Sequence, residues 1–233
     1  MSLPNYNPSN LSSMNGVISE VLKNFALTLE NCLPAVVVAY DRANNTVEVQ
    51  PAINTILTDG TAQARDTIKL PVHMFGGGGL VISAPLKAGD TGWIIASDRD
   101  TSLFKQSLSV SNPNTYRAHK LSFGFFVPDK VKGASIDASD SDAMVIQTLD
   151  GKTKIALQAG KVAIQSSADV SVKASNLTIE ASNVSIKGQT AITGNLTVNG
   201  TITATVDVLA GGISGKSHVH SGGTIEGKTG SPE

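Results

Sequence analysis

Two histidines near the C-terminal end, His218 and His220, are the pair whose types and spacing most plainly indicate chemistry. Side chains two residues apart in a strand point to the same face, about 7 Å apart. An H-x-H pair on its own is more often a plain exposed pair than a ligand pair, so its meaning depends on the elements that position it. If three chains met on one axis there, six imidazole nitrogens would form an octahedral site. Such a site suits iron(II) or nickel(II) and leaves no open position for catalysis.

The stretch before this pair consists of short repeats. Apolar-x-apolar triplets begin every seven or eight residues in its regular part and are separated by Gly, Asn, Ser, Asp and Lys. Apolar residues two apart have the side-chain period of a strand, whereas a coiled coil spaces them three and four apart. Each repeat is therefore predicted to be one short strand and one tight turn. The regular triplets are Ile155-Ala156-Leu157, Val162-Ala163-Ile164, Val170-Ser171-Val172, Leu177-Thr178-Ile179 and Val184-Ser185-Ile186.

Such a strand has too little apolar surface to bury alone, and a single-chain solenoid usually needs 20 or more residues per turn. Three chains wound together would complete each turn and fill a narrow interior with Val, Ile and Leu. The ten aromatic residues all lie between Tyr6 and Phe126, which fits a shaft too narrow to hold a ring. The sequence thus predicts a homotrimer with an intertwined triple-stranded β-helix over 144–210 and a metal-binding apex over 211–233.

The first half of the chain carries the strand and turn signals of a small barrel. We expect an all-β chain with an oligosaccharide-binding-type (OB-type) barrel over 33–126 and a connector over 127–143. Asp150-Gly151 is predicted to turn a hairpin that leads into the shaft. Strands are predicted at 35–40, 46–50, 68–70, 80–82 and 92–96.

Three aspartates of the connector, Asp137, Asp140 and Asp142, have spacings reminiscent of a calcium loop. The pattern lacks the glycine at the sixth position and the late glutamate that such loops use. A solvated turn is the favoured interpretation, and a structural calcium ion is the alternative.

Residues 1–32 are predicted to be a helical segment. Ser9 or Asn10 would cap its start, and Pro34 ends any helix. The apolar stripe of this helix either packs on the chain's own barrel, which we favour, or docks on a partner. The stripe consists of Leu11, Met14, Ile18, Val21, Leu22, Phe25 and Leu29.

Composition excludes several classes of function. A net charge of -1 argues against a nucleic-acid partner, and the single cysteine excludes a disulfide framework. No apolar run is long enough for a membrane helix, and Met1–Asn10 has no visible secretory signal, so export by the general secretory route is not expected. The six glutamates form no obvious acid/base pair, and Gly212–Lys216 misses the G-x-S-x-G elbow. We therefore expect neither catalysis nor a small-molecule substrate.

The chain resembles the central, membrane-piercing spike of contractile phage tail baseplates in three features together: the barrel, the repeat and the sequence His218-Val219-His220. The resemblance implies a rigid, non-enzymatic trimeric needle with one structural metal ion, iron, held at its tip by His218 and His220. The barrel stretches that carry the resemblance are Leu33-Pro34-Ala35-Val36-Val37, Val47-Glu48-Val49-Gln50-Pro51, Leu70-Pro71-Val72, Gly76-Gly77-Gly78-Gly79, Pro85, Gly89-Asp90-Thr91-Gly92-Trp93 and Ser97-Asp98-Arg99-Asp100.

The same resemblance implies that the protein is made in the host cytoplasm, without a signal peptide, and is located in the virion, at the tip of the tail baseplate. Its implied partners are the baseplate hub, the tail tube and, transiently, the bacterial outer membrane that it pierces when the sheath contracts. Two alternatives stay open. One is the spike of a related contractile injection machine, such as an R-type bacteriocin or a secretion system, and the other is a receptor-binding tail fibre or adhesin.

Overall fold

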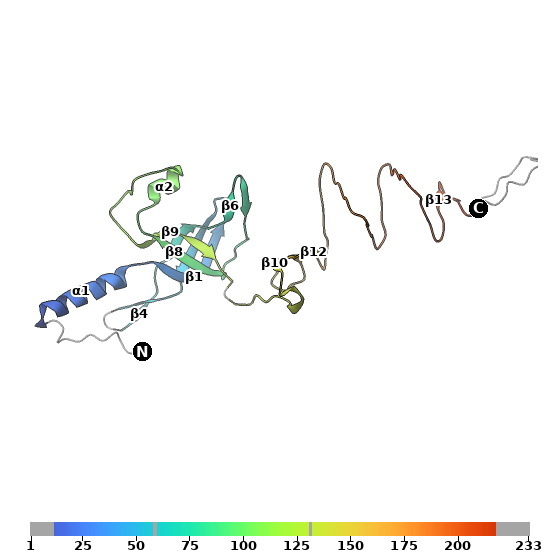
Figure 1. Ribbon diagram of the computed structural model, residues 1–233. Helices are drawn as coiled ribbons and strands as arrows, with labels where there is room; N and C mark the ends of the chain where they lie inside the picture. The colour runs from blue at the N-terminus through green and yellow to red at the C-terminus, as the bar shows by residue number, and fades with distance from the viewer. Residues whose placement is uncertain (1–11, 58–59, 131, 218–233) are drawn as a thin grey trace, which may run out of the picture. The chain divides into compact units, whose positions relative to one another are not determined.

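The structure, a computed structural model, describes residues 12–57, 60–130 and 132–217 (Figure 1). The chain divides into two units, Met1–Ser171 and Val172–Glu233. The described residues of the first unit form two α-helices, a short 3-10 turn, a barrel-like sheet, a smaller three-stranded sheet and two short hairpins. Among the described residues of the second unit, regular secondary structure is limited to one short hairpin. No helix in the described part of the chain is long and apolar enough to cross a membrane.

A five-stranded antiparallel sheet lies at the centre of the first unit, in the strand order β5-β2-β1-β8-β9. Four of its strands contain segments predicted from the sequence, and β9 has no counterpart among those predictions. The strands are β1 (Cys32–Asp41), β2 (Thr46–Pro51), β5 (Ile68–Pro71), β8 (Thr91–Ser97) and β9 (Lys120–Pro128).

The two edge strands of this sheet approach each other and nearly close it into a barrel. Val72, just past β5, forms a parallel bridge with Phe126 of β9. The His73 N–H also donates to the Phe126 carbonyl at 2.8 Å. Five strands in a partly open barrel is the OB-type architecture expected from the sequence.

Apolar side chains from alternate strand positions fill the barrel interior. Along β2, Val47 and Val49 are buried while their neighbours are only partly covered. Phe126 is fully buried, and a Cβ atom at Gly92 on the neighbouring strand would collide with its ring. Burying one such large side chain stabilises the fold by about 1.5–3 kcal/mol. The core consists of Ala35, Val37, Val47, Val49, Leu70, Val72, Ile94, Leu121 and Phe126.

Three smaller elements extend from the barrel. Strand β3 (Thr55–Ile56) pairs with β4 (Ala62–Gln63), and β6 (Phe75–Gly77) pairs with β7 (Leu80–Ile82). Gly78 and Gly79 have φ angles of 58° and 86°, the left-handed conformation that a two-residue hairpin turn of this kind requires. Helix α2 (Ser102–Ser107) follows β8 and was not expected from the sequence pattern.

Helix α1 (Met14–Thr28) lies within the predicted helical segment but starts late in it. Ser13 is its cap, because its Oγ accepts a hydrogen bond from the Gly16 N–H at 3.1 Å. The predicted caps, Ser9 and Asn10, lie outside the described residues. None of the helix residues is buried. The favoured interpretation, a helix packed on its own barrel, is therefore wrong for the single chain, and the stripe residues from Met14 to Phe25 are exposed.

The C-terminal part of the first unit is a three-stranded antiparallel sheet of β10 (Met144–Gln147), β11 (Lys154–Gln158) and β12 (Lys161–Gln165). The predicted hairpin turn at Asp150-Gly151 is confirmed between β10 and β11. Gly151 has a φ of 68°, and Thr148 Oγ1 donates to Asp150 Oδ1 at 2.6 Å. In the second unit, β13 (Leu209–Ala210) pairs with β14 (Ile213–Ser214).

Candidate functional site

The three-stranded sheet has one uncovered apolar face. Its residues form two rows across the strands, one through Ile146, Ile155 and Ile164 and one through Met144, Leu157 and Val162. All six side chains are exposed, with relative accessibilities from 39% to 66%. A monomeric protein rarely leaves six large apolar residues of one sheet face in water, because each would gain free energy by being covered. We call these six residues the sheet face.

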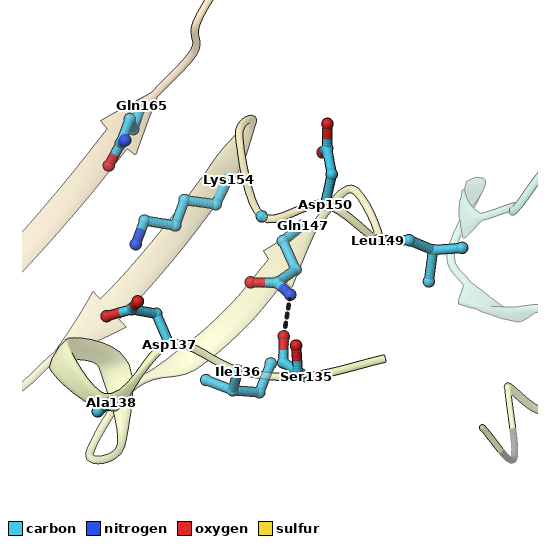
Figure 2. Close-up of a pocket in the computed structure, with 10 residues that line it drawn as sticks. Ser135, Ile136, Asp137, Ala138, Gln147, Leu149, Asp150, Lys154 and Gln165 are labelled. Atoms are coloured by element: carbon cyan, nitrogen blue, oxygen red, sulfur yellow. Dashed lines mark hydrogen bonds between the residues drawn. The ribbon is translucent and has the colours of Figure 1, made fainter. Parts of the chain in front are cut away.

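The opposite side of this sheet contacts the connector, as Figure 2 shows. Ala156 of β11 is buried there. The Lys154 ammonium forms an ion pair with Asp140, and only 12% and 9% of these two side chains remain exposed. Gln147 Nε2 donates to the Ser135 carbonyl at 2.7 Å. These contacts hold the connector against the sheet and leave the sheet face free.

The aspartates of the connector serve this packing. Asp137 caps a short 3-10 turn, η2 (Ala138–Asp140), by accepting from the Ser139 N–H at 2.9 Å and from its hydroxyl at 2.6 Å. Both hydrogen bonds lower the pKa of the Asp137 carboxyl below its ordinary value, and the bond from the Ser139 hydroxyl has the larger effect. Asp140 is paired with Lys154. Within the described ranges no three His, Cys, Asp or Glu side chains gather as a metal site.

Beyond β12, the repeat is extended and its apolar residues are uncovered. From 166 to 208 the described chain contains no paired strand, and it bends at 167–168, 175, 182, 188, 194, 199–200 and 205–206. Successive bends begin five to eight residues apart, which fits the predicted alternation of short strand and tight turn. From Val170 to Val208 every large apolar side chain is exposed, with relative accessibilities from 44% to 79%. These residues are Val170, Val172, Leu177, Ile179, Val184, Ile186, Ile192, Leu196, Val198, Ile202, Val206 and Val208.

The β13–β14 hairpin fixes the backbone immediately before the histidine pair. Gly211 and Gly212 turn it, with φ angles of 59° and 83°. Ser214 Oγ accepts from the Ser217 N–H at 2.9 Å, and Asp207 Oδ1 accepts from the Lys216 N–H at 3.0 Å. The hydrogen bond from Ser214, followed by those from backbone N–H groups, lowers the pKa of Asp207.

The predicted metal ligands themselves, His218 and His220, lie outside the described residues. The two other histidines have structural surroundings in the barrel. The His73 ring lies 5.5 Å from that of Phe75 and 5.6 Å from that of Phe125. His119 Nδ1 lies 3.8 Å from Asp98 Oδ1, and its carbonyl accepts from the Glu30 N–H at 3.2 Å.

Glu30 is a structural residue that the sequence pattern did not reveal. Its Oε1 pairs with Arg65 Nη1 at 2.8 Å, and its Oε2 accepts from the Leu121 N–H at 3.1 Å. Lys120 Nζ lies 3.9 Å from the same Oε2. These contacts attach the end of α1 to β9 and to the loop before β5. Only the glutamate's position between a helix and a strand hinted at this, because its partners lie 35 and 91 residues away.

Comparison with known families adds the last observation. Residues 33–129 match the family model of the phage protein Gp138 N-terminal domain. The matched stretch begins in β1 and ends just after β9, so the whole barrel is similar to this phage domain. The match confirms the resemblance to phage baseplate spikes that the barrel motifs indicated, and it supports a structural protein of a phage tail baseplate. A search of curated proteins gives no match.

Proposed function

We propose that three copies of this chain wind their repeats into one shaft, which acts as the membrane-piercing central spike of a contractile phage tail. The observation that carries the proposal is the row of exposed apolar residues from Val170 to Val208. Their two-residue spacing gives each strand one apolar side, and a single chain leaves that side in water. Two further copies, each supplying a strand per turn, would cover it.

The sheet face supports the same arrangement at the start of the shaft. Its two apolar rows have no cover in a single chain. In a shared shaft these rows would face the other two chains. The barrel, similar to a phage protein domain, would then form the upper end and dock on other baseplate proteins. A structural role also fits the absence of any acid/base pair in the sequence pattern, so we propose that the protein is not an enzyme.

The mechanism is mechanical. Sheath contraction supplies the work, and the spike transmits it to the outer membrane. A shaft in which every strand is hydrogen-bonded to strands of other chains resists bending, and the absence of open lateral edges protects it from aggregation. At the tip, His218 and His220 of three chains would hold one structural metal ion, iron. The ion would join three chain ends that otherwise fray.

Elemental analysis tests the tip separately from the shaft. The purified protein should contain one first-row metal ion per three chains, and the double variant His218→Ala/His220→Ala should contain none while keeping its oligomeric mass. The matched control, His73→Ala/His119→Ala, alters the histidines of the barrel and should keep the metal. A clearly different stoichiometry would remove the tip proposal, and full tip function without histidines or metal would favour a receptor-binding fibre.

A deletion tests the shaft. The chain without residues 1–126 should stay soluble and trimeric, because the repeat supplies its own shared core. Dissociation of this fragment into monomers would mean that the barrel, and not the repeat, holds the trimer together.

A further inference from the structure

Helix α1 carries an apolar seam that the fold of the single chain leaves uncovered. Met14, Ile18, Val21 and Phe25 succeed one another at intervals of four, three and four residues. This is the alternation of a coiled coil, in which such residues insert between those of a neighbouring helix. All four side chains are more than half exposed, from 52% for Ile18 to 77% for Met14. We call these four residues the seam.

The surroundings of the seam suit contact with identical helices. Val17 and Leu22 flank it and widen the apolar stripe to about 140° of the circumference at 100° per residue. The helix has two charged residues, Glu20 and Lys23, and both lie on the opposite side. Copies brought together through the seam would therefore bury no charge and meet no like-charge repulsion. Leu27 lies away from the seam and is not part of it.

The C-terminal end of the helix is bound to the barrel, whereas the rest of it extends away (Figure 1). Glu30 anchors this end through Arg65 and the Leu121 N–H, as described above. The last seam position would fall on Thr28, whose hydroxyl already donates to the Phe25 carbonyl at 2.7 Å. Because the Thr28 hydroxyl already has a hydrogen-bond partner in its own helix, its burial between helices costs little free energy.

We propose that the α1 helices of three copies of this chain associate through the seam as a short parallel coiled coil. The number three rests on the proposed shared shaft, and a three-fold axis makes the copies parallel. With 15 residues the helix has only about two heptads, too few for stable association by itself. Copies held together by the shaft meet at a high effective concentration, which makes a short seam sufficient.

Disulfide cross-linking of the full chain tests the proposal. The natural thiol, Cys32, is exposed and is first removed by Cys32→Ser. Val21→Cys then places a thiol in the seam, and the matched control Ser19→Cys places one on the same turn but away from it. After mild oxidation of dilute protein, Val21→Cys should give covalent dimers with up to about two thirds of the chains linked, since each trimer leaves one thiol unpaired. Ser19→Cys should give several-fold less.

Sedimentation of the same reduced samples separates the possible failures. If the protein is a trimer but Val21→Cys and Ser19→Cys cross-link equally, or neither variant cross-links, the coiled coil is overturned and the shared shaft stands. The apolar seam of the helix would then bind another baseplate protein or a lipid surface. A monomer overturns the shared shaft as well. Circular dichroism of both variants should match that of the parent, so that a difference in cross-linking reports on proximity and not on loss of helix.

Discussion

Ile186 tests whether the apolar residues of the repeat are covered by other copies of the chain. It belongs to the triplet Val184-Ser185-Ile186, and in the single chain 72% of it is exposed. Truncating so exposed a side chain in a monomer costs at most about 0.5 kcal/mol. In a shared shaft the same side chain is buried, and Ile186→Ala costs about 2–5 kcal/mol per copy. With three copies, the trimer loses about 6–15 kcal/mol.

The assay is unfolding in guanidinium chloride followed by circular dichroism at one fixed chain concentration, because the stability of a trimer depends on that concentration. Ser185→Ala is the matched control, since it alters the neighbouring residue on the other side of the same strand. We expect a large loss for Ile186→Ala and a change within about 0.5 kcal/mol for Ser185→Ala. If both variants fall within that narrow range, the repeat has no shared core and the reasoning is refuted.

Three further predictions concern the described contacts. Glu30→Gln removes the charge that pairs with Arg65 and should lower the stability of the barrel by about 1–3 kcal/mol in thermal unfolding; an unchanged midpoint would mean that the anchor is unimportant. Asp140→Asn leaves the largely buried Lys154 ammonium without its charged partner and should cost about 3 kcal/mol, whereas Asp142→Asn should cost almost nothing. Because the pKa of Asp207 is lowered in the folded state, its hydrogen bonds stabilise the β13–β14 hairpin above about pH 4 and are lost as the pH falls through the folded value. The protection of the Lys216 N–H, which is its amide exchange rate compared with that of an unstructured peptide at the same pH, should therefore fall in acid, and protection that does not change with pH would contradict this.

The elements that sequence reasoning located are those with a strong local pattern. The alternating residues of β2 and the turn at Asp150-Gly151 are found where expected, because strand period and turn chemistry are local properties. Helix α1 was also expected, but its cap is Ser13, since several Ser and Asn residues in a row offer competing caps.

What the sequence did not reveal depends on long-range contacts. Strand β9 is defined by its pairing with β8 and by the bridge from Val72 to Phe126, and neither is visible in a local window. The Glu30 anchor joins residues distant in the chain in the same way. The predicted packing of α1 on its own barrel was wrong. An amphipathic stripe indicates that one side of a helix is covered, but it does not indicate which surface covers it.

Sedimentation equilibrium of the full-length protein tests the shared shaft most directly. The chain has a mass of 24.1 kDa, and the account predicts a single species of three times that mass, independent of concentration over the accessible range. A monomer of 24.1 kDa would contradict it, because the apolar residues of the sheet face and of the repeat would then have no other chain to cover them.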